Sequence, residues 1–368
     1  MARRTKPEEQ GGSPGSLPSL QSRLVKKLGA DKNLAGVIKQ AGGSLLSDTP
    51  YYISTQCATL NYALGRPGIP ASKVTTIFGR EGSGKSSLGY HLLAETQQQG
   101  GIAVLADAEQ RFPRDRAVQM GLNLDDLIIV EGATLEQAFD AIEKIIQEVR
   151  AESLTMPVTV VYDSLAGSVT EKRRDAEVSD VIVAHTARFV SAELPRLKLR
   201  IARTGVALVI INQLRSRVDF GSDPRASKYA ERNKVMGQKH SMLAEWPLMF
   251  ESALMIYVNS IAQLGDDRDA PTGIRSRAVI RKCGISPREG WRAEFDIDYM
   301  TGIDRLGSKF DLLVELGVID GGAGGWYGFA DAETYGEKKW QRREFSDKLD
   351  EFPSLETVIE EAPLSWQK

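Results

Sequence analysis

A short glycine-rich run constrains this sequence more than any other segment. Residues 79–87 read Gly-Arg-Glu-Gly-Ser-Gly-Lys-Ser-Ser and contain the pattern G-x-x-x-x-G-K-S. A β-rich run, 74–78, precedes the pattern, and residues 87–93 after it can open a helix. In that context the loop turns backbone N–H groups inward and forms a cradle for phosphates at the N-terminus of the helix. The alternative, a chance match to a glycine-rich turn, is disfavoured because strand and helix lie on the correct sides.

The residues of this loop have distinct expected roles. Gly84 leaves space where phosphates approach the backbone. Lys85 places a positive charge on the β- and γ-phosphates, and the Ser86 hydroxyl can bind Mg²⁺. ATP and Mg²⁺ are therefore the predicted cofactors. The loop residues expected to contact the nucleotide are Gly79, Arg80, Glu81, Gly82, Ser83, Gly84, Lys85, Ser86 and Ser87.

Composition narrows the class of protein. The chain has 368 residues and a formal net charge of −2, so a nucleic-acid site has to be a local basic patch. Its only cysteines, Cys57 and Cys283, lie far apart in the sequence, which predicts neither a disulfide framework nor a zinc site and fits a reducing cytoplasm. No apolar run approaches the ~18–20 residues of a membrane span, and the N-terminus lacks the apolar core of a secretory signal. We therefore expect no membrane association.

Apolar runs alternate with an amphipathic helical pattern through the middle of the chain, which favours a parallel sheet covered on both faces. The expected elements are strands at 102–106, 158–162 and 206–211, a helix at 135–150, and later antiparallel strands at 254–258 and 276–280. We predict an α/β fold: a P-loop ATPase core with a mostly parallel central sheet, a short N-terminal helix and tether, and a small α+β C-terminal domain.

Changes in composition predict the domain organisation. Residues 1–21 are rich in Gly, Pro, Ser and charge, and are expected to be disordered. Residues 22–48 hold a helical pattern at 24–40 and a short strand at 44–47 that would serve as an oligomerisation tether. The ATPase core is expected at 49–303. Residues 304–368 form the small C-terminal domain, which ends in a charged tail containing Trp340.

Two acids follow predicted strands. Asp163 ends the run 158–163 and is expected to hold Mg²⁺ through water, the alternative being an aspartate that caps a turn. Glu109 follows the strand 102–106 and is the predicted general base for the attacking water, the alternative being a surface acid. Because the carboxyl ends of parallel strands meet at one edge of a sheet, both acids should lie near the γ-phosphate.

Polar segments leave the same strand ends. Gln213, after the strand 206–211, can hydrogen-bond the γ-phosphate and change conformation when that phosphate leaves. Residues 214–238 form a polar segment longer than the usual ~12–15, and either bind DNA or form a solvated loop. Basic side chains with an aromatic among them suit DNA phosphates and base stacking or wedging, and a second basic loop lies at 170–180. The predicted DNA-binding residues are Lys172, Arg173, Arg174, Arg188, Arg215, Arg217, Phe220, Arg225, Lys228 and Arg232.

Taken in order, these motifs resemble those of the RecA family of homologous-recombination ATPases. The resemblance runs from about residue 53 to residue 329. It rests on the phosphate loop with Glu81, on Asp107-Ala108-Glu109 as the catalytic-glutamate motif, on 160–164 as the second nucleotide motif and on 211–215 as the sensor motif. Further similar segments are 53–55, 60–65, 312–319 and 325–327.

The sequence also departs from the family's pattern. Arg116 stands where the family has an aromatic residue that stacks on adenine, and the plane of its guanidinium group can stack instead. Met236-Gly237-Gln238 replaces a Gly-Gly pair. The two lysines that reach the neighbouring subunit's γ-phosphate fall near Arg281, Lys282 and Cys283, of which we assign Arg281 and Lys282 as the contacts across the subunit interface. With Trp340 and the charged end, these departures resemble phage-encoded UvsX-like recombinases more than a typical bacterial member.

The resemblance implies an ATP-dependent strand-exchange protein that forms a helical filament on single-stranded DNA and pairs it with a homologous duplex, hydrolysing ATP to ADP and phosphate. Its implied partners are single- and double-stranded DNA and further copies of itself, with single-strand-binding and loader proteins as additional candidates. Two alternatives stay open. A hexameric helicase motor is disfavoured by the short N-terminal region, and a non-catalytic filament scaffold regulated by ATP is disfavoured by Glu109.

Overall fold

The computed structural model describes residues 20–31, 49–152, 156–171, 181–216, 240–267 and 270–367. It divides the chain into two units, Met1–Asp48 and Thr49–Lys368. In the first unit, helix α1 (Leu20–Gly29) begins earlier than the predicted helical segment and carries Lys26 and Lys27 in its last turn, where cations suit the helix dipole. The predicted continuation of that segment and the predicted strand at 44–47 lie outside the described residues.

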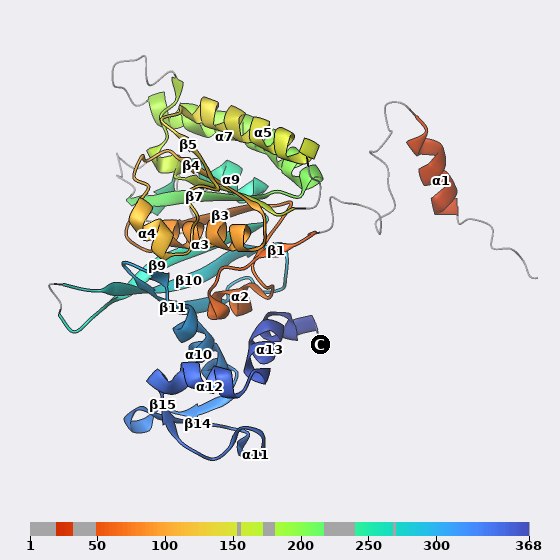
Figure 1. The fold of residues 1–368 in the computed structure, drawn as a ribbon. Coiled ribbons are helices and arrows are strands. Elements are labelled where there is room, and N and C mark those ends of the chain that lie inside the picture. The colour runs from red at the N-terminus through yellow and green to blue at the C-terminus, as the bar shows by residue number, and fades with distance from the viewer. Residues whose placement is uncertain are drawn as a thin grey trace, which may run out of the picture. The chain divides into compact units, whose positions relative to one another are not determined.

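The described residues of the second unit form a ten-stranded sheet (Figure 1). From one edge to the other, the strands are β12 (Gly302–Ile303), β11 (Arg292–Asp298), β10 (Gly273–Cys283), β9 (Leu254–Leu264), β3 (Val74–Gly79), β7 (Ala207–Ser216), β6 (Val158–Asp163), β4 (Ile102–Asp107) and β5 (Leu127–Glu131), with β8 (His240–Met242) paired to β7. The strands from β9 to β5 run parallel, whereas β10, β11 and β12 continue the sheet antiparallel. The predicted mostly parallel α/β fold is therefore confirmed.

Helices cover both faces of the parallel strands (Figure 1), because these strands are apolar on both sides. Alternate residues of β4 show the two layers: Ala103 and Leu105 pack in one cluster with helix α3, and Val104 and Ala106 pack in the other with α5 and α7. The helices of this core are α2 (Ala58–Leu64), α3 (Lys85–Gln98), α4 (Arg114–Gln119), α5 (Leu135–Glu152), α7 (Val181–Thr204) and α9 (Glu245–Glu251). Short elements complete it: β1 (Tyr52–Ile53), β2 (Ile69–Pro70) and the 3-10 turn η2 (Leu165–Gly167).

The predicted boundary of the long polar segment was wrong at its beginning. Strand β7 does not end at residue 211 but continues through Ser216, and its last residues pair with β8 in the register Leu214↔Met242 and Ser216↔His240. Pairing with a later strand gives the backbone groups of 214–216 hydrogen-bond partners, which a search for apolar runs cannot detect. Residues 217–239 lie outside the described residues.

The residues after Asp304 combine helices with a three-stranded sheet, in line with the α+β expectation. The described elements are α10 (Arg305–Glu315), β13 (Ile319–Gly321), η3 (Ala323–Gly325), β14 (Trp326–Phe329), α11 (Ala332–Tyr335), β15 (Trp340–Gln341), η4 (Arg342–Glu344), α12 (Phe345–Glu351), α13 (Ser354–Glu361) and η5 (Ala362–Gln367). This region packs on α2, where Ser308 Oγ accepts from Ala58 N–H at 3.1 Å and Trp366 Nε1–H donates to the Gly65 carbonyl at 2.8 Å. Among the described helices, none is long and apolar enough to cross a membrane.

Candidate active site

The glycine-rich loop joins β3 to α3, as the sequence predicts, and lies against the antiparallel half of the sheet. Gly84 has a φ of 89°, and a Cβ atom there would come within 2.1 Å of Ile297 Cδ1. A Cβ atom on Gly79 would come within 1.9 Å of the Val258 carbonyl oxygen. The close approach of neighbouring strands therefore requires glycine at both positions, whether or not a phosphate is bound.

Lys85 is the first residue of α3, and its side chain is almost completely buried, with 6% exposed. Its Nζ atom donates to the Arg80 carbonyl within the loop at 2.5 Å. Burial lowers the pKa of Lys85, and the carboxylates of Asp163, Glu109 and Glu81 act in the opposite direction. The ammonium group is thus held inside the loop and faces the acids that the sequence predicted around the γ-phosphate.

Asp163 is buried at the end of β6, beside the loop. Its pKa is raised from 3.8 to about 6, mainly by burial and also by the charges of Glu109 and Asp107, while a hydrogen bond with Ser86 and the charge of Lys85 oppose the rise. Ser86 and Asp163 thus bring a hydroxyl and a carboxylate oxygen together, and Mg²⁺ prefers such hard oxygen ligands. A divalent cation would also offset the crowding of negative charge that raises this pKa, so the residues present fit Mg²⁺.

Glu109 is held by side chains from two other segments, strand β7 and the residue that follows β6. Its Oε1 atom accepts from Gln213 Nε2 at 2.7 Å and from Ser164 Oγ at 2.5 Å. A Cβ atom on Gly167 would come within 2.6 Å of Glu109 Cγ, so the absence of a side chain there lets the glutamate pass. Glu109 opens onto a cavity of about 350 Å³ that is lined by Glu81, Ala108, Glu109, Arg111, Ala166, Gly167 and Gln213.

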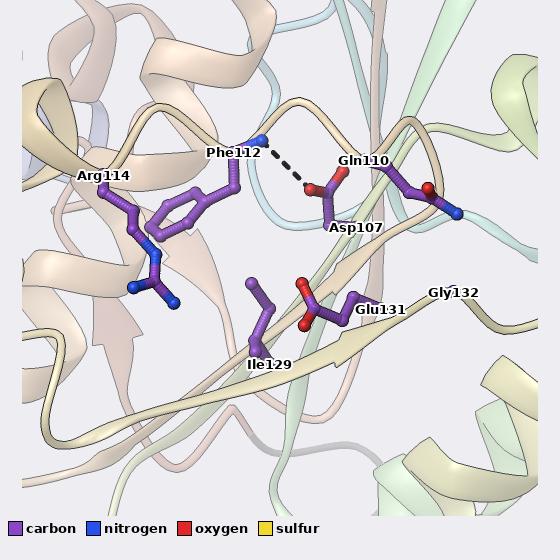
Figure 2. A pocket seen from close by; sticks show the side chains of 7 residues that line it. All are labelled: Asp107, Gln110, Phe112, Arg114, Ile129, Glu131 and Gly132. Carbon is purple, nitrogen blue, oxygen red and sulfur yellow. Dashed lines mark hydrogen bonds between the residues drawn. The ribbon is translucent and has the colours of Figure 1, made fainter.

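Asp107, at the end of β4, anchors the segment that carries Glu109. Its Oδ2 atom accepts from the Phe112 backbone N–H at 3.0 Å (Figure 2), and the Ala108 N–H donates to the Asp163 carbonyl at 2.8 Å. A second cavity of about 350 Å³ is lined by other residues of this segment and by β5 and its end: Asp107, Gln110, Phe112, Arg114, Ile129, Glu131 and Gly132. The backbone from 108 to 112 is therefore tied to the strand ends at both of its limits.

Arg116 lies on α4 and reaches the phosphate-loop helix, where its guanidinium donates to Ser87 Oγ at 2.9 Å. Burial lowers the pKa of Arg116, while the nearby Tyr90, Asp298 and Tyr299 raise it. Tyr299, an exposed aromatic in the turn after β11, was not among the predicted residues. The only signal for it in the sequence was an acidic residue followed by an aromatic one, Asp298-Tyr299, in a turn whose position next to α4 depends on the sheet.

Arg281 and Lys282 lie on β10, which β9 separates from the strand of the phosphate loop, β3. Lys282 pairs with Met255, which pairs with Thr76 in the middle of β3, whereas Gly79 at the start of the loop pairs with Val258. The Arg281 guanidinium lies 5.4 Å from the centre of the Tyr257 ring, and Lys282 Nζ donates to the Met249 carbonyl at 2.6 Å. In the described part of the chain, both cations thus contact β9 and α9 and not the phosphate loop.

The predicted DNA-binding residues fall mostly outside the described residues. Arg188 is exposed on α7. Arg215 belongs to the end of β7, so its backbone is part of the sheet instead of the predicted loop. Those outside the described residues are Lys172, Arg173, Arg174, Arg217, Phe220, Arg225, Lys228 and Arg232.

Known proteins are similar to this chain over most of its length. A family model described as the RecA N-terminal domain matches residues 26–240, a range that holds Lys85, Glu109, Asp163 and Gln213. The chain is 32% identical over 333 residues to Protein RecA of Chlorobium chlorochromatii, covering 90% of this chain and 84% of that protein. It is 33% identical over 297 residues to Protein RecA of Chlorobaculum parvum, with 81% and 78% covered, and 28% identical over 337 residues to Protein RecA of Paracoccus denitrificans, with 92% and 83% covered.

Proposed function

Because this chain belongs to the RecA family, we propose that the cluster of Lys85, Glu109, Asp163 and Gln213 is the ATPase site with which it drives homologous recombination. The chain is an ATP-binding, DNA-dependent ATPase that pairs and exchanges DNA strands as a helical filament. The observation that supports this site is the convergence of four separate segments, α3, the end of β6, the segment after β4 and β7, on one connected group of side chains.

Each residue of the cluster has a proposed task in hydrolysis. Lys85 holds the β- and γ-phosphates, because it is the buried cation of the loop. Glu109, fixed by Gln213 and Ser164, accepts the proton of the water that attacks the γ-phosphorus. Ser86 and Asp163 would hold Mg²⁺, which when bound offsets the negative charge of the phosphate oxygens. Arg116 lies beside Ser87, with Tyr299 near its guanidinium group, and these two side chains would cover the base of the nucleotide.

Gln213 is the proposed link between the nucleotide and DNA. Its amide donates to Glu109, and a γ-phosphate in the same cavity offers a competing acceptor. Residue 213 lies within β7, which runs on through Ser216 to the predicted DNA-binding segment. A Gln213→Ala variant should keep basal ATP binding and lose the rise in DNA affinity that ATP produces. Full retention of that rise, measured as DNA affinity with ADP and with a non-hydrolysable ATP analogue, would disprove the link.

The positions of Arg281 and Lys282 support assembly of the filament. Since both side chains contact β9 and α9 instead of their own phosphate loop, the nucleotide that they contact would belong to a neighbouring copy of the chain. Head-to-tail contacts of this kind generate a helix when the rotation does not close. Residues 1–48 are the proposed docking segment, and their deletion should give a monomer by light scattering, whereas persistent filaments would exclude that role.

The test of the proposed function is the Lys85→Ala variant. Wild-type protein should hydrolyse ATP faster with single-stranded DNA and form extended helical filaments with a slowly hydrolysed ATP analogue in electron micrographs. The variant should lose ATP binding and both activities, because the loop loses its buried cation. Lys144→Ala is the matched control, since Lys144 is an exposed cation paired with Asp140 on α5. Closed rings would indicate a helicase, and filaments without hydrolysis would indicate a scaffold.

A further inference from the structure

Arg111 lies in the same cavity as Glu109, and no motif of the sequence assigns it a role. Its Nη1 atom is 3.8 Å from Glu81 Oε1, in the phosphate loop, and 3.9 Å from Glu109 Oε2. Of the described residues that line this cavity, it is the only one with a cationic side chain. A guanidinium group thus stands between the phosphate loop and the predicted general base.

The two ion pairs of this guanidinium group are long and exposed to solvent. Both separations from the carboxylates exceed hydrogen-bond distance, and the side chains of Arg111 and Glu81 are 74% and 79% exposed. Ion pairs between exposed groups contribute little to stability, so the side chain can leave Glu81 at small cost. The guanidinium group is therefore free to respond to a new anion in the cavity.

The backbone under Arg111 is fixed, in contrast to its side chain. Phe112 N–H donates to Asp107 (Figure 2), and Glu109 is held by Gln213 and Ser164. Between them Gln110 has a φ of 55°, a left-handed conformation that turns the chain sharply. Arg111 therefore starts from a defined point close to Glu109, and only its side chain has to move to reach a ligand.

We propose that Arg111 is a catalytic residue that acts on the nucleotide of its own chain. The proposal rests on the ATPase function proposed above. With ATP bound, the guanidinium group leaves Glu81 and donates to oxygens of the γ-phosphate while it stays beside Glu109. A planar group with five donors can contact both anions, and it stabilises the charge that spreads over the γ-phosphate oxygens in the transition state.

The hydrolysis step balances without a proton on or off Arg111. The water oxygen forms a bond to the γ-phosphorus, and the water's proton passes to the Glu109 carboxylate. The bond between the γ-phosphorus and the bridging oxygen breaks, and its electron pair remains on the β-phosphate of ADP. Arg111 keeps its charge throughout and acts only through hydrogen bonds and electrostatic attraction.

The test compares R111A and R111K with R114A, a matched control because Arg114 is an exposed arginine that lines the neighbouring cavity (Figure 2). Steady-state kinetics with saturating single-stranded DNA give kcat and KM for ATP. Displacement of a fluorescent ADP analogue gives the affinities for ADP and for ADP with aluminium fluoride, a mimic of the transition state.

We expect R111A to lower kcat by at least about tenfold. This loss is smaller than the ~10³–10⁵-fold contribution of arginine fingers because Lys85 also stabilises the phosphate charge. The ADP affinity of R111A should stay within about twofold of wild type, whereas its affinity for ADP with aluminium fluoride should fall by the same factor as kcat. R111K should restore part of both kcat and this affinity, and R114A should match wild type.

The opposite results have distinct meanings. If R111A keeps wild-type kcat, or weakens ADP and ADP with aluminium fluoride equally, Arg111 is not catalytic. A double variant with E81Q separates neutralisation from catalysis: if E81Q restores R111A, Arg111 only offsets the charge of Glu81, and the proposal is overturned. If wild-type protein itself shows no DNA-stimulated hydrolysis, the proposed ATPase function fails first. If wild-type protein hydrolyses ATP and R111A has the same kcat as R114A, the role of Arg111 is refuted while the proposed ATPase function stands.

Discussion

Charged side chains are buried at the ends of β4 and β6, whereas aromatic side chains are buried in the region after Asp304. Asp107, Asp163 and Lys85 are all buried around the phosphate loop, and the pKa of Asp163 is raised because its charge is poorly solvated. In the C-terminal region the ring of Trp340 is 1% exposed and lies 5.5–6.1 Å from the rings of Phe329 and Phe345. Buried charge lowers stability unless it is compensated, and buried rings raise it.

This difference separates what stabilises the chain from what its site does. In the proposed function the strand-end residues act on a charged ligand, so their substitution should change chemistry more than folding. The buried aromatic residues around Trp340 pack against one another, so their substitution should change folding more than chemistry. A large effect on folding from a strand-end substitution, or on chemistry from an aromatic one, would contradict that separation.

Glu109→Gln should have the largest effect, and it should fall on turnover alone. The amide cannot accept the proton of the attacking water, and loss of a general base costs ~10²–10⁴-fold in rate. ATP binding and the melting temperature should stay near those of wild type, and filaments on DNA should persist. Turnover within a few-fold of wild type would mean that another acid, such as Glu81, is the base.

Trp340→Ala should have the opposite effect. Removing this buried ring should lower the free energy of unfolding by about 3–5 kcal/mol, because the surrounding rings cannot fill the cavity. ADP affinity of the folded protein, measured below the unfolding transition in urea, should be unchanged. Trp246→Ala is the control: Trp246 is 50% exposed on α9, and its loss should change the unfolding free energy by less than about 0.5 kcal/mol.

Asp163→Asn should stabilise the nucleotide-free protein at neutral pH. The pKa of Asp163 is raised from 3.8 to about 6 in the folded chain, so the folded state holds this proton more tightly than the unfolded state. The stability contributed by the neutral carboxyl is present below pH ~4 and is lost as the pH rises through ~6, by at most about 3 kcal/mol. The variant should therefore unfold at higher denaturant at pH 7 and lose this pH dependence. A less stable variant would show that the carboxylate is well compensated.

Glu356→Gln should have the smallest effect. Glu356 Oε1 lies 2.6 Å from Lys309 Nζ, in a partly exposed pair between α10 and α13. Such pairs contribute about 0.2–1 kcal/mol, and salt screens them. Chemical unfolding at low and high salt should show a small loss that disappears at high salt. A loss of several kcal/mol would mean that charge, as well as aromatic packing, holds the C-terminal region together.

Local pattern was sufficient for much of this molecule. The glycine-rich loop, the strands β3, β4 and β6 and the helix α5 were predicted close to their observed limits, because glycine spacing and apolar periodicity act over a few residues. The prediction that strand ends carry the catalytic groups also followed from sequence, since parallel strands present their carboxyl ends at one edge.

The tertiary structure decided which of these groups touch. The sheet order β3-β7-β6-β4 brings Gln213 and Ser164 onto Glu109, and no local pattern encodes the order of strands that are far apart in the chain. The same reason explains why β5, the end of β7, Tyr299 beside Arg116 and Arg111 beside Glu109 were not predicted. Trp340, which the sequence placed in a charged tail, is the centre of an aromatic core, because burial depends on what the rest of the chain packs around a residue and not on its neighbours in sequence.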